Sequence, residues 1–224
     1  MIGVVIPTLN EAEFLPALLG DLRRVAIPLD IVIADGGSTD GTLAAASAAG
    51  VRTMVAPRGR AGQMNAGARA AIGRWLLFLH ADSRLPPQAR RELLTAVVDD
   101  PELQAAVFAF AIDLPPGWKR FIEVGQALRQ KMYGLSYGDQ GLLVRRELFE
   151  AVGGYPDVPL LEDVVTLRAL GRRARVRTLP AVIVTSGRRY QRDGVVRTWL
   201  RHSAIIFLYS LGVTPQRLAR WRGR

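Results

Sequence analysis

The stretch Ile31-Val32-Ile33-Ala34-Asp35-Gly36-Gly37-Ser38 joins an apolar run to a glycine-rich turn, and this junction decides the fold. The apolar run ends at a carboxylate, and the two glycines permit close approach of the backbone. Ser38, Thr39 or Asp40 is expected to cap the following helix. Residues 41–49 then continue as an Ala-rich segment with helical spacing. The pattern predicts a strand, a tight turn and a helix in succession.

The same alternation extends on both sides of this junction through the first hundred residues. β-type runs, each followed by a polar or glycine-rich turn, cover Val4–Ile6, Thr53–Val55 and Trp75–Leu79. Apolar residues at helical spacing cover 11–25 and 61–72. This order predicts an α/β fold, with a mostly parallel sheet flanked by helices. Such sheets bind ligands beyond the carboxyl ends of their strands, where the polar segments of this chain cluster.

Beyond residue 85 the alternation becomes less regular. We expect one domain over residues 1–180 and a basic helical extension over 181–224. The expected elements are a helix over 86–98, a strand over 105–112, a helix from the Pro115-Pro116-Gly117 break to about Met132, a strand over 141–144, and helices over 146–152 and 162–170.

The positive charge is concentrated in the C-terminal quarter. Residues 1–167 carry 16 Lys+Arg and 19 Asp+Glu, a net charge of −3, whereas residues 168–224 carry 14 Arg and only Asp193, a net charge of +13. Such a tail attracts phosphorylated small molecules or acidic lipid head groups. Nucleic acid is not expected, because the tail has no aromatic-interleaved basic pattern and no known recognition module. The absence of Cys excludes disulfides, thiolate metal sites and a Cys nucleophile.

No membrane-spanning segment or signal peptide is expected from the sequence. The chain opens directly on a strand-like run without a basic segment before it. The apolar run at 204–213 has ten residues, about half of the roughly 20 that span a bilayer. Two interpretations of this run stay open: a helix packed on the domain, or a helix lying on an anionic membrane with Arg side chains at the phosphates. We therefore expect a cytoplasmic protein, with peripheral contact at the inner face of the membrane as the alternative.

Polar segments that follow the first strands have the chemistry of a nucleotide site. Asn10, in Pro7-Thr8-Leu9-Asn10-Glu11, is expected to cap the next helix. The Asp35 carboxylate suits a base N–H or a ribose hydroxyl. Arg58 and Arg60 precede a helix start rich in small residues, which suits phosphate. A nicotinamide enzyme is disfavoured, because the Gly-x-Gly-x-x-Gly pattern is absent.

Acidic residues in three later segments suit metal binding and acid–base chemistry. Asp82, in His80-Ala81-Asp82-Ser83, is placed to bind a divalent cation that bridges substrate phosphates, although it also fits an ordinary loop acid. Glu162 and Asp163 open a helix, so these acids also suit the helix dipole. Asp139 fits either an acceptor hydroxyl or a turn, and His202 either a metal shell or a structural role.

Four segments in order resemble the signatures of family 2 glycosyltransferases with the GT-A fold. They are Val5–Glu11, Ile33–Thr42, the Asp82 segment and Leu161-Glu162-Asp163, and the similarity covers roughly residues 1–175. Two further stretches, 59–67 and 137–141, resemble a subgroup of small bacterial members. That subgroup is named for radical-SAM or selenium-domain neighbours, or for arsenosugar biosynthesis.

The resemblance implies a role for each matching residue. Asp82 would hold Mg²⁺ or Mn²⁺ on the diphosphate, and Asp163 would be the catalytic base with Glu162 beside it. His80 stands where the family usually has a second acid, so one carboxylate of the metal motif is missing here. The acceptor would meet Gly138, Asp139 and Gln140. The nucleotide would meet Pro7, Thr8, Asn10, Glu11, Asp35, Gly36, Gly37, Ser38, Arg60, Gln63, Asn65 and His80.

The implied activity is metal-assisted transfer of a sugar, with inversion, from a nucleoside-diphosphate sugar to the hydroxyl of an unidentified acceptor. Such transfer needs a base on the acceptor side and stabilisation of negative charge on the leaving group. The tail does not reproduce the Gln-x-x-Arg-Trp signature of processive members, so a single addition is expected. Two alternatives are a catalytically weak scaffold that binds anionic membrane through its tail, and a nucleotidyltransferase on a similar sheet.

Overall fold

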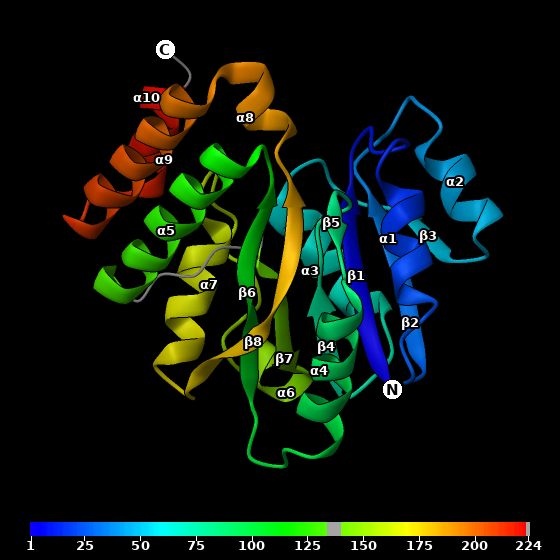
Figure 1. Ribbon diagram of the computed structural model, residues 1–224. Helices are drawn as coiled ribbons and strands as arrows, with labels where there is room; N and C mark the ends of the chain where they lie inside the picture. Colours follow the sequence, from blue (N-terminus) through cyan, green and yellow to red (C-terminus); the bar gives the residue numbers. More distant parts are fainter. Residues whose placement is uncertain (134–139, 223–224) are drawn as a thin grey trace.

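The computed structural model describes residues 1–133 and 140–222, with side chains described for 1–126 and 140–221. Within the described residues, eight strands form one sheet in the order β3-β2-β1-β4-β7-β6-β8-β5, with helices on both faces (Figure 1). The strands are β1 (Ile2–Thr8), β2 (Leu29–Asp35), β3 (Arg52–Val55), β4 (Trp75–Phe78), β5 (Ser83–Arg84), β6 (Ala105–Asp113), β7 (Leu142–Arg145) and β8 (Val176–Ser186). The helices are α1 (Leu15–Leu22), α2 (Thr42–Ala48), α3 (Arg60–Ala70), α4 (Pro87–Val98), α5 (Pro116–Tyr133), α6 (Arg146–Ala151), α7 (Glu162–Gly171), α8 (Arg188–Asp193), α9 (Val195–Ser210) and α10 (Pro215–Arg222).

The sheet brings the carboxyl ends of six strands to one edge. β1 pairs in parallel with β2 and β4, and β2 pairs in parallel with β3. β7 runs antiparallel to both β4 and β6, so β6 again points in the direction of β4. β8 is parallel to β6, and the short β5 is antiparallel to β8. The predicted α/β class with a mostly parallel sheet is therefore confirmed, and the loops after β1, β2, β3, β4, β6 and β8 share one edge.

β8 is an eleven-residue strand that the sequence analysis did not predict. In its pairing with β6, Leu179 faces Phe108, but the next residue of β6, Ala109, faces Val182. The register therefore shifts between these two pairs. Pro180 and Ala181 therefore lie in a bulge, where a proline without an N–H is tolerated. The expected domain boundary at residue 180 falls inside this strand, and the first helix after it, α8, begins at Arg188.

Two apolar layers sandwich the sheet. One contains buried side chains of α1, α2 and α4, and the other contains those of α3, α6 and α7. Helix α3 lies very close to β1, since a Cβ atom added at Gly67 would overlap Cγ1 of Val5. This close approach brings the start of α3 beside the ends of β1 and β2, where the polar loops lie.

The C-terminal helices pack against the domain through one side of α9. Ile205 and Ile206 are buried together with Leu161 and Val164 near the start of α7. In Figure 1, α9 and α10 lie beside α5 and α7 at one end of the sheet. Most of the apolar run at 204–213 thus lies in α9, which packs on the domain on this side and ends at Ser210. No helix in the described part of the chain is long and apolar enough to cross a membrane.

Candidate functional site

The loop after β1 is bonded across to the loop after β2. Asn10 has a φ of +58°, and its N–H donates to Ser38 Oγ at 2.9 Å. Its side-chain oxygen accepts from the Thr39 N–H at 2.9 Å. The expectation that Asn10 caps the next helix is wrong: the N-cap of α1 is Phe14, because turns occupy the residues between them. Asn10 instead ties two strand-end loops together.

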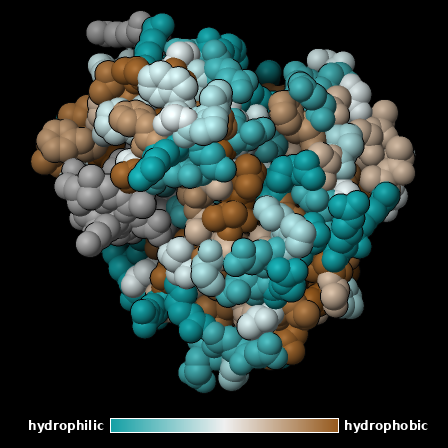
Figure 2. Space-filling view, viewed as in Figure 1, coloured by the Kyte–Doolittle hydropathy of each residue, from teal (hydrophilic) through white to brown (hydrophobic). Residues whose placement is uncertain are grey.

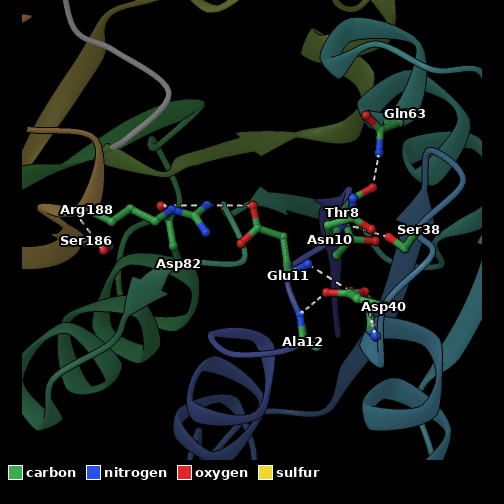
Figure 3. Close-up of polar contacts among 11 residues, drawn as sticks. Thr8, Asn10, Glu11, Ala12, Ser38, Asp40, Gln63, Asp82, Ser186 and Arg188 are labelled. Atoms are coloured by element: carbon green, nitrogen blue, oxygen red, sulfur yellow. Dashed lines mark hydrogen bonds and ion pairs between the residues drawn. The ribbon is translucent and has the colours of Figure 1, made fainter. Parts of the chain in front are cut away.

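Two further backbone groups extend this connection (Figure 3). The Glu11 N–H donates to Thr42 Oγ1 at 2.8 Å, and the Ala12 N–H donates to Asp40 Oδ2 at 3.1 Å. Asp40 also accepts from the Thr42 N–H at 3.0 Å, at the start of α2. The loops after β1 and β2 therefore form one connected unit.

The Asp35 carboxylate is buried and bonded to the protein itself. One oxygen accepts from Thr8 Oγ1 at 2.8 Å and Ser38 Oγ at 2.5 Å, and the other accepts from the N–H groups of Gly37 and Ser38 at 2.9 and 2.7 Å. Burial acts to raise the pKa of Asp35, but the hydrogen bonds from Ser38, Thr8 and Gly37 outweigh it, and the pKa lies below its usual value. Asp35 thus stays ionised and holds the glycine turn.

Gln63 joins the ends of β1 and β2 from helix α3. Its amide nitrogen donates to the carbonyls of Thr8 and Ala34, at 2.6 and 2.8 Å. A Cβ atom at Gly36 would come within 3.1 Å of the same nitrogen, so Gly36 leaves room for this side chain. Gln63 therefore fixes the ends of β1 and β2 relative to α3, beside the smaller cavity.

Asn65 forms a two-way hydrogen bond with the backbone of Tyr155. Its amide nitrogen donates to the Tyr155 carbonyl at 2.7 Å, and its oxygen accepts from the Tyr155 N–H at 2.9 Å. Burial, together with the charges of Asp163 and Glu162, raises the pKa of the Tyr155 phenol well above its usual value against the opposing effect of Arg60. The phenol is therefore neutral, and Asn65 anchors the segment that leads to the two acids.

A cluster of opposite charges lies at the other end of the site. Nη2 of Arg188 is 2.6 Å from Glu11 Oε1 and 3.3 Å from Asp82 Oδ2, and the guanidinium carbon lies 4.4 Å from the ring centre of Phe14. Figure 3 shows the guanidinium between the two carboxylates. Burial acts to lower the pKa of Arg188, but Glu11, Asp82 and Glu13 raise it above its usual value. These groups follow β1, β4 and β8, so the sheet edge assembles them.

Two adjoining cavities lie over the carboxyl edge of the sheet. The smaller, of about 350 Å³, contains Glu11, Asp82 and Arg188, and the larger, of about 830 Å³, contains Glu162 and Asp163. Both are lined by Arg58, Gly59, Arg60, Arg189 and His202. Groups suited to phosphate therefore stand where the cavity with Asp82 meets the cavity with Asp163.

Glu162 and Asp163, two acids that line the larger cavity, follow a residue with an unusual backbone conformation. Leu161 has a φ of +65°, and it directly precedes the start of α7. Glu162 is buried, and its Oε1 lies 3.4 Å from Nη1 of Arg60. Among the described residues, Asn10 is the other non-glycine residue with positive φ. Such conformations cluster at functional sites, and here they occur beside both cavities.

The predicted site residues fall into three groups. The first group lines neither cavity and instead forms the contacts that hold the loops after β1 and β2; it contains Asn10, Asp35, Gly36, Gly37 and Ser38. Gln140 is fully buried and donates to the Phe108 carbonyl at 2.9 Å, whereas Gly138 and Asp139 lie outside the described residues. The cavities bring together Pro7, Thr8, Glu11, Arg60, Gln63, Asn65, His80, Asp82, Glu162 and Asp163.

Three residues of one helix that line the smaller cavity were missed by the sequence analysis. They are Arg188, Arg189 and Tyr190, all in α8. The rule that polar residues after strands form the site applies to them as well, because α8 follows β8. These polar residues were not recognised as following a strand, because β8 itself had not been predicted.

The residues near Asp82 fit a divalent cation that takes further ligands from a substrate. No group of three or more His, Cys, Asp or Glu forms a complete metal site among the residues described. Mg²⁺ is commonly held by one or two carboxylates, with phosphate and water completing the shell. Asp82 and Glu11 supply two carboxylates, and Glu11 Oε2 is buried without a hydrogen-bond partner among the described atoms.

Loops that follow the strands bring carboxylates and arginines together over one edge of a mostly parallel sheet. This arrangement is that of an α/β protein with a ligand site at the carboxyl edge of its sheet. The model of the family described as "Glycosyl transferase family 2" matches residues 3–152, and the chain belongs to this family. The predicted family and its GT-A fold are thereby confirmed.

Relatives agree with this assignment. The PGL/p-HBAD biosynthesis glycosyltransferase of Mycobacterium bovis (strain BCG / Pasteur 1173P2) is 31% identical over 165 residues, which are 69% of this chain and 63% of that protein. The chain thus spans less than two thirds of the length of this relative.

Solved structures show the same fold. The mannosyltransferase PcManGT from Pyrobaculum calidifontis, in complex with GDP-Man and Mn²⁺, has 26% identity and a TM-score of 0.61, covering 83% of this chain and 56% of that one. Glucosyl-3-phosphoglycerate synthase from Mycobacterium tuberculosis, in complex with Mn²⁺, UDP-Glc and phosphoglyceric acid, has 20% identity and a TM-score of 0.59, covering 83% and 71%.

Proposed function

We propose that this chain transfers a sugar, with inversion and in single additions, from a nucleoside-diphosphate sugar to an acceptor hydroxyl. The observation that carries the proposal is the pair of adjoining cavities, with Asp82 in one, Asp163 in the other and arginines shared between them. Membership in glycosyl transferase family 2 supports the reaction class. The similarity to a mannosyltransferase solved with GDP-Man and Mn²⁺ supports the donor class.

The smaller cavity would take the donor. Asp82, with Glu11, would hold Mg²⁺ or Mn²⁺, which supplies positive charge to the diphosphate when bound. Arg58 and Arg60 stand where the cavities meet, and they would stabilise the negative charge that develops on the departing nucleoside diphosphate. This role needs no proton from the protein, because the diphosphate is a good leaving group once its charge is neutralised.

The larger cavity would take the acceptor. Asp163 would accept the proton of the acceptor hydroxyl as that oxygen attacks the anomeric carbon of the sugar. Glu162, beside it, is paired with Arg60, so it would connect the base to the leaving-group side. Apolar side chains such as Leu160, Ile205 and Ile206 line the same cavity, which suits an acceptor with an apolar part.

The test replaces the proposed base and leaves its charge neighbours in place. Asp163→Asn should reduce sugar transfer by about 10²–10⁴-fold, because it removes general base catalysis. Calorimetric affinity for UDP, GDP or dTDP in the presence of Mn²⁺ should change little. Asp157→Asn is the matched control, since Asp157 lines the same cavity and is exposed.

Three results would contradict the proposal. Loss of nucleotide affinity in Asp163→Asn would place Asp163 on the donor side. Failure of the unmodified chain to bind any of the three nucleotides with Mn²⁺ would remove the donor site. A product mass that shows an added nucleotide rather than an added sugar would identify a nucleotidyltransferase.

We also propose that the chain contacts an anionic membrane surface through α9. Val196, Leu200 and Phe207 are each at least half exposed, and their spacing of 4 and 7 residues puts them on one face of the helix. Leu211, the C-cap of α9, is also exposed and follows Phe207 by four residues. Figure 2 shows hydrophobic residues among hydrophilic ones over the part of the surface that α9 and α10 occupy in Figure 1. We call these four residues the α9 stripe.

Charge favours lipid over a second copy of the chain as the partner of the α9 stripe. Residues 188–222 carry eight Arg and one Asp. Two copies meeting at this surface would bring these cations together, whereas anionic lipid head groups would neutralise them. The apolar side chains would then enter the interface between head groups and acyl chains.

A further inference from the structure

Arg188 connects three loops that the proposed donor site requires. One nitrogen of its guanidinium lies 2.6 Å from Glu11 Oε1 and 3.3 Å from Asp82 Oδ2. Both carboxylates are largely buried, with side chains 17% exposed, whereas the side chain of Arg188 is 40% exposed. A single positive group from α8 therefore stands between two acids that follow β1 and β4 (Figure 3).

The acids in this cluster outnumber its cation. Glu11 and Asp82 contact Arg188, and Glu13 also acts on its charge. At this end of the cavity the carboxylates of Glu11 and Asp82 would repel a diphosphate that approached without a cation, whereas Arg58, Arg60 and Arg189 line the rest of the cavity. Glu11 Oε2 is buried and accepts no hydrogen bond from a described residue, so this carboxylate still has an acceptor to offer. The cluster is therefore suited to a cation of higher charge than Arg188.

We propose that Arg188 acts as a resident cation of the empty donor site, and that a divalent cation exchanges with it at Glu11 and Asp82 when the donor binds. This inference rests on the proposed donor function of the smaller cavity. Glu11 would supply the second carboxylate, in place of the acid whose usual position His80 occupies. The released guanidinium would then donate to phosphate oxygens of the diphosphate, which it suits through its planar set of N–H groups.

The exchange needs rotation of one side chain and no movement of a helix. The backbone before α8 is held in place, because a Cβ atom at Gly187 would overlap the Asp113 carbonyl. The Arg188 N–H donates to Ser186 Oγ at 3.2 Å, which further anchors the start of α8. The partly exposed guanidinium rests over the ring of Phe14, from which it can turn toward the cavity.

The test measures Mn²⁺ binding to the full chain without any nucleotide. Arg188→Met removes the competing cation, and the variant should bind Mn²⁺ about tenfold more tightly than the unmodified chain in calorimetric titration. Arg192→Met is the matched control, because Arg192 also lies in α8 but is exposed and pairs with Asp193. It should bind Mn²⁺ as the unmodified chain does. Glu11→Gln should weaken Mn²⁺ binding.

A second titration tests the other half of the exchange. In saturating Mn²⁺, Arg188→Met should bind GDP or UDP several-fold more weakly, since the guanidinium can no longer reach the diphosphate. If Arg188→Met does not fold by circular dichroism, Arg188→Gln replaces it, with tighter Mn²⁺ binding again expected because glutamine carries no positive charge to compete with the metal.

Mn²⁺ affinity that is unchanged, weaker or absent in the Arg188 variant would overturn the exchange. Unchanged nucleotide affinity would overturn the transfer of the guanidinium to the diphosphate. If no nucleotide binds even to the unmodified chain, the proposed function fails, while the titration with Mn²⁺ alone still reports on the exchange.

Discussion

Asp35, Gln63 and Asn65 show how single polar residues build this site before any ligand arrives. Each forms hydrogen bonds with another part of the chain: Asp35 with Thr8 in β1, Gln63 with the ends of β1 and β2, and Asn65 with the backbone of Tyr155. Buried polar groups need such partners, because an unpaired one costs about 1–3 kcal/mol. Asp35 therefore lies behind the cavities, whereas Gln63 and Asn65 form part of their lining together with Asp82, Arg188 and Asp163.

Asp35→Asn tests this supporting role through pH. The pKa of Asp35 is lowered in the folded chain, so its contribution to stability is present above the unfolded pKa of about 3.9 and is lost as the pH falls through the folded value. At pH 7 the variant should lose about 2 kcal/mol of unfolding free energy in urea.

The difference between Asp35→Asn and the unmodified chain should shrink as the pH falls below about 4. Asp99→Asn, at an exposed position, should show no comparable difference. A constant difference between pH 7 and pH 3 would mean that the carboxylate charge does not stabilise the turn.

At the scale of elements, the close packing of α3 on β1 determines where the site lies. Gly67 faces Val5 with no room for a side chain, which lets the helix approach the sheet. Arg60, Gln63 and Asn65 all project from the first turns of the same helix. A shift of α3 away from β1 would therefore displace the arginine, the loop support and the Tyr155 anchor together.

Replacing Gly67 by Ala tests this packing against a matched helix position. Gly67→Ala should lower the unfolding free energy by about 1–3 kcal/mol, because the added methyl group overlaps Val5. Gly20→Ala, in α1, meets nothing within 4 Å and should raise the unfolding free energy by about 0.5–1 kcal/mol. Thermal and urea unfolding measure both. Equal effects of the two changes would show that α3 does not need the close approach.

Over the whole molecule, charge and exposed apolar surface are gathered at the C-terminal end. The Arg-rich helices contribute Arg188, Arg189 and His202 to the cavities on their inner side. The α9 stripe lies on the exposed side of α9. The same segment thus contributes residues to the proposed active site and presents a surface suited to anionic lipid.

Vesicle flotation tests the membrane contact. The chain should float with vesicles of anionic phosphatidylglycerol and should not float with vesicles of neutral phosphatidylcholine. Binding should weaken as the salt concentration rises, because the contact is partly electrostatic. Replacing Leu200 and Phe207 by Ser should weaken binding. The control replaces Val55 and Val98, which are also exposed but lie in β3 and α4. Equal binding of both double variants would contradict a role for the α9 stripe.

Local patterns in the sequence were sufficient for the fold class and for much of the cavity lining. Apolar runs that end at polar turns, as at Asp35 and Asp82, reflect period and turn chemistry, which act over a few neighbouring residues. Residues after parallel strands meet at one edge for topological reasons, and this rule predicted the position of Asp82. Asp163 opens α7 and does not directly follow a strand, so its role was predicted from the family resemblance alone. The two acids line adjoining cavities. Tertiary structure decided which polar residues face the cavities and which are used internally, as the buried Asp35 shows. It also decided the position of Arg188, because β8 contains a proline bulge that hides its period, and its pairing with β6 depends on residues about 70 positions apart in the chain.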